Sequence, residues 1–318
     1  MKRKSLQVPR LYPSSLLVNT LNTNGGEQFT IMHSKEHPIP WFSPDYTPRF
    51  FNLDSETEKK VVLISTKVTG VFEAAINHQS NENICVVPNF DNPLQSKEIQ
   101  GGFLSWGTLI RKCVSSYLDV ETNELSVNYF LRGKDNTETE IRPAIYLIEN
   151  LENGAGYTNH LGEMDDKMKY KVFIEPLLEG GVLYEKLLSD SHKNKCDCSC
   201  YDCLRDYYNQ QSHSILNWRL GLDLAHISAD ENFIPLYTRG YWKEVVDICL
   251  LGYKRENSEA KIKEENDIIF VETNEMKFSL IHPFWSKHFI ESRININEYP
   301  TVFITQFLRN FGKDLKIK

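Results

Sequence analysis

The sequence predicts an α/β protein, with a mixed sheet, flanking helices and a structural zinc knuckle. Three observations predict it: short runs rich in β-branched residues, segments whose apolar residues recur at helical spacing, and four cysteines within eight residues. The chain has 318 residues, of which 41% are hydrophobic and 25% charged, as in ordinary globular proteins with a substantial core. Its formal net charge of −7 argues against a domain that holds DNA through overall positive potential.

Strands are expected where β-branched and apolar residues form short runs: 61–72, 84–87, 125–131, 144–149, 267–272, 277–282 and 301–306. Helices are expected where apolar residues recur at helical spacing: 103–117, 213–225, 241–251 and, with interruptions, 165–189. The charged stretch 254–266 is expected to be a solvated linker or loop. No apolar run is long enough to cross a bilayer, so no membrane partner is expected.

Composition divides the chain into three expected parts. Residues 1–58 are rich in Pro, Asn, Ser and aromatics and are expected to form an extended N-terminal arm. Residues 59–230 hold most predicted elements and the cysteine cluster, and are expected to form a zinc-binding α/β domain. Residues 231–318 are expected to form a C-terminal α/β extension.

The cysteine cluster is the strongest chemical signal in the chain. It contains Cys196, Cys198, Cys200 and Cys203. Cys200-x-x-Cys203 has the spacing of a zinc knuckle, because two intervening residues let both sulfurs turn onto one ion. We expect Cys196, Cys200 and Cys203 to be ligands, with Cys198 or His213 as the fourth; His192 also lies nearby in sequence.

Disulfides are the alternative use of such a cluster. The N-terminal Met-Lys-Arg-Lys is followed by polar residues and prolines without the apolar stretch of a signal peptide, so a cytoplasmic location is expected. In a reducing cytosol, clustered cysteines indicate a metal more often than disulfides. Neither an HExxH nor a His-x-Glu pattern accompanies them, so the expected cofactor is structural Zn²⁺ and no catalytic residue is predicted.

A glycine motif, Gly154-Ala155-Gly156, follows the predicted strand 144–149 and precedes a helical region. A strand, a glycine turn and a helix can present backbone amides to a phosphate. The motif is neither GxGxxG nor GxxxxGK[ST], however, so a plain tight turn is the preferred interpretation.

Several segments together resemble one family. They are Ser65–Thr69, Trp106–Arg111 with Leu118–Val120, Glu124–Val127, Ile148–Tyr157, Cys196–Arg205 and Asn217–Leu220, with His282–Trp285 as a looser match. In order and approximate spacing they resemble the zinc-binding C-terminal domain of bacterial DEAD/DEAH-box helicases of the MrfA type, which also occurs in the DrmB component of DISARM phage defence. The resemblance covers about half to two-thirds of the chain, and the family commonly has a Ser where this chain has Cys198.

The resemblance implies an accessory function. The sequence contains neither a Walker A motif nor a DExH box, so it lacks the ATP-hydrolysing motor of those helicases. The implied function is a non-catalytic zinc-binding subunit of a helicase-containing DNA-processing complex, in antiphage defence or DNA repair. The implied partners are a separately encoded helicase or ATPase subunit and, through the complex, DNA.

Two other functions are considered. Asp267, Glu275 and Lys277 loosely resemble the acidic and E-x-K residues of restriction-like nucleases, although Glu275 is expected in a solvated hairpin turn. The second of these functions is that of a purely structural subunit that contacts only protein. Tyr157, Tyr201, Tyr207 and Tyr208 could stack on exposed bases, but core packing is the expected use of most of them.

Overall fold

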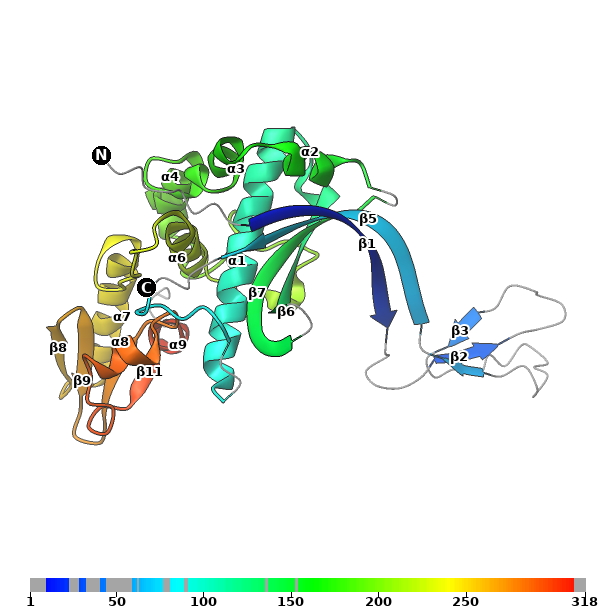
Figure 1. Ribbon diagram of the computed structural model, residues 1–318. Coiled ribbons are helices and arrows are strands. Elements are labelled where there is room, and N and C mark those ends of the chain that lie inside the picture. Colours follow the sequence, from blue (N-terminus) through cyan, green and yellow to red (C-terminus); the bar gives the residue numbers. More distant parts are fainter. Residues whose placement is uncertain are drawn as a thin grey trace.

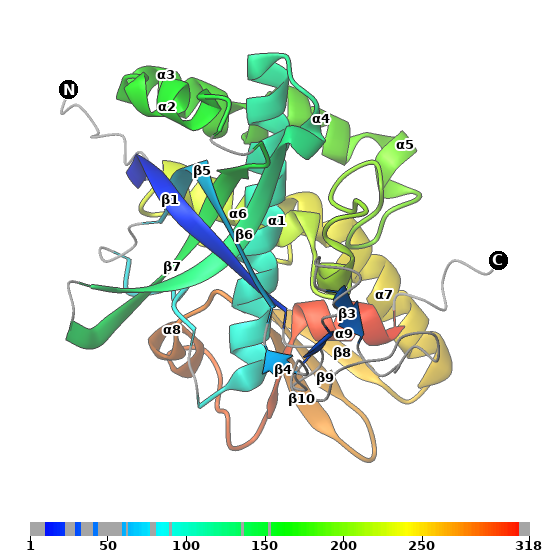
Figure 2. The same ribbon diagram turned by 90° about the vertical axis from the view of Figure 1, so that its right-hand side faces the viewer.

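The structure is a computed structural model, and it describes residues 10–22, 29–32, 41–43, 59–61, 63–76, 81–88, 91–134, 137–151 and 154–311. Helices and strands are both well represented, which confirms the α/β class. Within the described residues the strands form two four-stranded sheets and one three-stranded sheet. Figures 1 and 2 show the larger curved sheet on one side of a long helix and most of the shorter helices on the other.

The first sheet has the order β1-β5-β7-β6 and is antiparallel throughout. Its strands are β1 (Arg10–Asn22), β5 (Leu63–Ala75), β7 (Thr137–Glu149) and β6 (Leu125–Lys134). β1 pairs with β5 along its whole length, from Arg10 opposite Ala75 to Asn22 opposite Leu63. Part of the expected N-terminal arm is therefore a sheet strand. The small sheet β3-β2-β4 joins β3 (Trp41–Ser43), β2 (Phe29–Met32) and β4 (Lys59–Val61).

Helix α1 (Pro93–Leu118) organises the core, because it packs against the sheet on one side and against α6 (Trp218–Ala229) on the other. It begins ten residues before the predicted start: Asn92 caps Gln95 N–H, and Pro93 occupies the first turn, where its missing N–H costs nothing. Gly107 permits the close approach to the sheet, since a Cβ there would lie 2.6 Å from Val127 Cγ1.

The region between β7 and α6 is a series of short helices and turns. Those before the cysteines are α2 (Tyr157–Glu163), α3 (Asp166–Phe173), α4 (Val182–Leu188) and α5 (Asp190–Lys193). The expected interruptions of 165–189 are confirmed, since a 3-10 turn at Glu175–Leu177 and the Gly180–Gly181 pair separate α3 from α4.

The C-terminal part adds a mixed sheet of order β11-β10-β9-β8, in which β10 and β11 are parallel. It contains β8 (Lys261–Glu265), β9 (Ile268–Glu272), β10 (Lys277–Ile281) and β11 (Thr301–Phe303), with α7 (Lys243–Glu256), α8 (Lys287–Glu291) and α9 (Ile304–Phe311) around it. The prediction of a loop over 254–266 was wrong in part: α7 continues to Glu256, and β8 pairs with β9 although four of its five residues are exposed.

The cores on the two sides of the predicted boundary near residue 230 are continuous. One cluster of buried apolar side chains extends from Phe72 to Leu308. The Glu98 carboxylate, 1% exposed on α1, receives two hydrogen bonds of 2.7 Å from Arg309 on α9. Asp223 on α6 accepts hydrogen bonds from Trp242 and His282. A boundary at 230 remains a prediction.

Among the described residues, no helix combines the length and the apolar character that a membrane crossing requires.

Candidate metal centre

The metal centre is built by a short helix and the knuckle that follows it. Four groups, one from each of His192, Cys196, Cys200 and Cys203, have potential ligand atoms that all lie within 4.8 Å of one another. His192 is on α5, and the cysteines follow it at intervals of four, four and three residues. The Cys200 carbonyl oxygen accepts the backbone N–H groups of Cys203, Leu204 and Arg205, which closes the turn between the last two sulfurs.

The distances between the sulfurs fit a tetrahedral zinc site. Cys203 Sγ lies 3.7 Å from Cys196 Sγ and 3.6 Å from Cys200 Sγ. Zn–S bonds of about 2.3 Å at tetrahedral angles separate two sulfurs by about 3.8 Å. A disulfide would bring them to about 2.05 Å, and the seven cysteines are all free thiols. The cluster therefore has the spacing of metal ligands.

His192 has the hydrogen bonding of a metal-binding histidine. Its Nδ1 lies 2.8 Å from the carbonyl oxygen of Leu187, so Nδ1 carries the proton and Nε2 keeps a free lone pair. The residue is 7% exposed, and its buried Nε2 has no hydrogen-bond partner among the described residues. A buried nitrogen without a partner is costly, and a bound cation beside the three sulfurs would remove that cost.

The pKa shifts in the cluster follow from the crowding of its sulfurs. The hydrogen bond with Cys196 lowers the pKa of the Cys203 thiol to about 4, and the same contact raises the pKa of Cys196. The Cys203 sulfur also raises the pKa of His192. Buried sulfurs this close do not all ionise unless a cation compensates their charge, which Zn²⁺ provides.

Two residues predicted as possible fourth ligands lie outside the group. Cys198 is separated from Cys196 by one residue, and its carbonyl oxygen instead accepts the N–H of Trp218 at 2.9 Å, which holds this turn against α6. His213 Nε2 lies 3.0 Å from the Asp206 carbonyl oxygen and 2.8 Å from Asn209 Oδ1. The structure thus brings Cys196, Cys200 and Cys203 together with His192. The signal that could have found His192 is its spacing of four residues from Cys196.

Arg219 ties the knuckle to the core. This arginine is 2% exposed; it donates to the carbonyl oxygen of Asp197 in the knuckle and, at 2.9 Å, to that of Tyr241. Its guanidinium carbon lies 4.1 Å from the centroid of the Trp218 ring, within cation–π range. Burial lowers the pKa of Arg219, but the group remains a cation at neutral pH.

The glycine motif surrounds a carboxylate of the chain itself. Glu149, at the end of β7, is 1% exposed and accepts the backbone N–H groups of Ala155, Gly156 (3.0 Å) and Thr158 (2.8 Å), as well as the Thr158 hydroxyl at 2.7 Å. Burial acts to raise the pKa of Glu149, but the hydrogen bonds from Thr158, Ala155 and Gly156 together lower it. Because these backbone N–H groups already donate to the Glu149 carboxylate, they are not free to bind a phosphate. This agrees with the interpretation of the motif as a structural turn.

The comparisons with known proteins agree with this geometry. Residues 107–204 match the family model of the MrfA Zn-binding domain, a range that contains all four members of the cluster. This segment is similar to MrfA-type zinc-binding domains. The expected cofactor, Zn²⁺, is thereby confirmed, and the cluster offers four potential ligand atoms, the number that a structural zinc site uses.

A solved structure and a search of curated proteins complete the comparison. The solved structure is that of the DUF1998 helicase MrfA bound to DNA; it has 12% sequence identity and a TM-score of 0.29, and the match covers 64% of this chain. The chain spans a quarter of that protein's length (25%). No curated protein matches the chain.

Proposed function

We propose that the chain is a non-catalytic accessory subunit of a helicase-containing DNA-processing complex, and that His192, Cys196, Cys200 and Cys203 hold its zinc ion. The cluster of four potential ligand atoms, three of them on buried residues, is the observation that carries the proposal, because a zinc ion with four protein ligands has no free position for a substrate. The MrfA-type domain supports a helicase as the partner, since the sequence has no ATPase motif of its own.

The zinc ion stabilises the knuckle between α5 and α6, which is part of the surface that the subunit presents to its partner. The knuckle joins α5 to α6 through the Trp218 amide and Arg219, and it contributes little apolar core of its own, chiefly Leu204, Ile215 and Leu216. In such segments the free energy of metal binding is free energy of folding. The proposed partner is a separately encoded helicase or ATPase, and the proposed setting is bacterial antiphage defence or DNA repair in the cytoplasm.

The test is a purification of the tagged full chain from its native host, with zinc and co-purifying proteins measured in one eluate. The expected result is one zinc ion per chain together with an ATPase that carries helicase motifs. The Cys203→Ser variant should lose both, whereas Cys198→Ser should retain both. A chain that retains its zinc but captures no ATPase would contradict the accessory role.

The nuclease alternative is not favoured by the structure. Asp267 precedes β9, whereas Glu275 lies in the exposed turn beyond the other end of that strand. At roughly 3.3 Å per residue, the five residues of the strand separate the two carboxylates by more than about 15 Å. Lys277 instead forms an ion pair of 2.8 Å with Glu272. These residues do not converge on one metal ion.

A further inference from the structure

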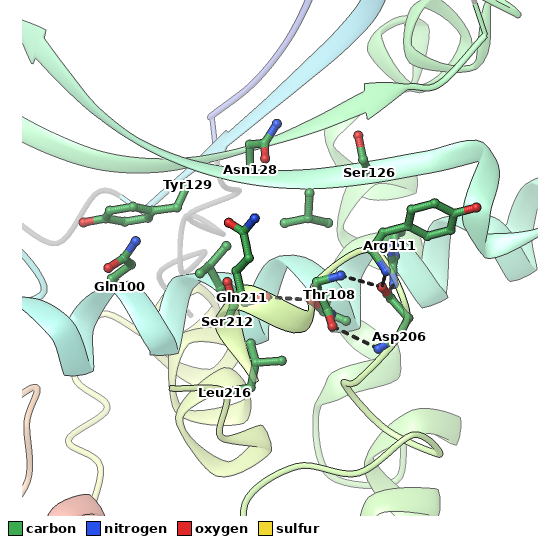
Figure 3. A pocket seen from close by; sticks show the side chains of 14 residues that line it. Gln100, Thr108, Arg111, Ser126, Asn128, Tyr129, Asp206, Gln211, Ser212 and Leu216 are labelled. Carbon is green, nitrogen blue, oxygen red and sulfur yellow. Dashed lines mark hydrogen bonds and ion pairs between the residues drawn. The ribbon is translucent and has the colours of Figure 1, made fainter. Parts of the chain in front are cut away.

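A polar cavity of about 320 Å³ lies beside the zinc knuckle. Its walls come from three parts of the chain: the middle of α1, the strand β6, and the segment 206–216 that leads from the knuckle to α6. Figure 3 shows Gln211 and Ser212 between the helix and the strand, with Tyr129 and Gln100 toward one end and Arg111 with Asp206 toward the other. The volume falls in the lower part of the range for small-molecule sites.

Two buried polar groups of this cavity have no hydrogen-bond partner among the described residues. Arg111 is 5% exposed, and its Nε is buried and unpaired. The hydroxyl of Tyr129 is likewise buried and unpaired, and burial raises the pKa of this group, so it stays a neutral donor. Buried donors without acceptors cost about 1–3 kcal/mol each, a cost that a ligand with acceptor atoms would remove.

The cavity is electrically neutral. Among its lining residues the only acid is Asp206 and the only base is Arg111, and these two form an ion pair with each other. Asp206 also accepts the N–H groups of Tyr208 and Asn209. The other polar side chains of the residues that line the cavity are amides and hydroxyls. A phosphate or another full charge is therefore poorly matched here, whereas a neutral planar group with several donors and acceptors is well matched.

A pair of exposed aromatic rings lies beside the cavity. Tyr208 lines it and is 72% exposed, and its ring lies 5.5 Å from that of Tyr207, which is 76% exposed. Tyr201, on the same knuckle, is 68% exposed. Core packing was the expected use of these tyrosines, and for these three it was wrong. Exposed aromatic side chains next to hydrogen-bonding groups are the means by which proteins bind unpaired bases.

We propose that this cavity takes a single unpaired nucleobase of a nucleic-acid strand, held by the amide of Gln211 and by the donors of Arg111 and Tyr129, with Tyr208 stacking at its mouth. The base must come from a single strand, because the hydrogen-bonding edges of a duplex are paired and its bases are stacked. The proposal rests on the function proposed above, in which the complex acts on DNA, and it names the part of the DNA that this chain would contact.

The test compares two fluorescein-labelled strands of about 16 nucleotides, one a mixed DNA sequence and the other of equal length with abasic sites throughout. Binding to the zinc-loaded full chain is measured by fluorescence anisotropy. Removing one stacked base costs about tenfold in affinity. We therefore expect the normal strand to bind at least about tenfold more tightly than the abasic strand, and this difference to disappear in the double variant Tyr208→Ala, Gln211→Ala.

The matched control is the double variant Tyr117→Ala, Asn274→Ala, which removes an exposed tyrosine and an exposed amide away from the cavity and should keep the difference. Tyr208 and Gln211 are exposed, so both variants are expected to fold, which zinc content and circular dichroism verify. Equal binding of the two strands would overturn the nucleobase site but leave a DNA-processing role intact. Binding to neither strand would also overturn it, and the co-purification experiment would then decide the proposed function separately.

Discussion

Replacing Cys203 by serine removes the sulfur at the centre of the metal cluster. This sulfur lies within 3.7 Å of both Cys196 Sγ and Cys200 Sγ and also receives the Cys200 N–H at 3.2 Å. A serine hydroxyl is a poor substitute, because zinc prefers a thiolate and the hydroxyl stays protonated at neutral pH. We expect Cys203→Ser to lose the zinc ion and to destabilise the domain.

The magnitude follows from the number of ligands. Structural zinc contributes an apparent free energy of about 10–16 kcal/mol, or roughly 3–4 kcal/mol for each of four ligands. Losing one ligand therefore weakens zinc binding by about 10²–10³-fold. A loss of about 3 kcal/mol in zinc-binding free energy would lower the midpoint of thermal unfolding by roughly 6–12 °C, and complete loss of the zinc would lower it further.

A comparison of His192→Ala with Cys198→Ser decides the fourth ligand. His192→Ala removes a proposed ligand and also an imidazole ring whose centroid lies 5.7 Å from that of the Trp218 ring. We therefore expect its zinc content and its midpoint of thermal unfolding both to fall. Cys198→Ser is nearly isosteric, and it keeps the carbonyl that accepts the Trp218 amide. We expect it to retain one zinc ion per chain.

The assay measures zinc per chain by atomic emission and unfolding by circular dichroism, on proteins purified without chelator. The His192 assignment is refuted if Cys198→Ser loses its zinc while His192→Ala keeps it. One zinc ion per chain in all three variants would refute the cluster itself as the metal centre.

Three further predictions concern the framework of the site. Glu149→Gln replaces an acceptor of two backbone amides by an NH₂ group, and should cost about 3 kcal/mol in unfolding free energy at pH 7. Because the folded pKa of Glu149 is lowered, its stabilisation is complete above the ordinary value near 4.5 and is lost as the pH falls through the folded value, so wild type and variant converge in acid in urea unfolding. Arg219→Lys loses the paired hydrogen bonds to the knuckle and to Tyr241, and should cost about 2–4 kcal/mol and accelerate zinc release to a chelator. Gly101→Ala places a Cβ against the backbone carbonyl of Ile215, and should lower stability by about 1–3 kcal/mol in thermal unfolding.

The arginine and glycine changes each have a control on the surface. Arg239→Ala removes an exposed arginine from a 3.5 Å ion pair with Asp267, and should change stability by less than about 1 kcal/mol. Ser116→Ala removes a hydroxyl and leaves an alanine at an exposed position of the same helix as Gly101, and should be neutral or slightly stabilising. A control that destabilises as much as its partner variant would contradict the packing argument for that site.

Local patterns in the sequence predicted much of the architecture. The β-branched runs at 267–272 and 277–282 correspond to β9 and β10, because strand formation there depends on residues that are close in sequence. The start of α1 was missed by ten residues, since apolar periodicity is weak at its N-terminal end, and the helix there is fixed by the Asn92 cap and by packing against Ile215 and Phe284. β8 was missed because its charged residues acquire their strand geometry only by pairing with β9.

The sequence alone predicted a metal site, because four cysteines within eight residues indicate a shared metal ion more often than separate uses. The tertiary structure decided which groups come close enough together to share a metal ion. The Trp218 amide holds the turn at Cys198 against α6, while α5 brings His192 to the sulfurs with its Nε2 unpaired. The polar cavity is likewise tertiary, because Gln100, Asn128 and Gln211 are far apart in the chain and meet only where α1, β6 and the knuckle pack together. Spacing in sequence fixes which atoms can reach one another, but the direction in which each side chain points depends on backbone contacts made by distant residues.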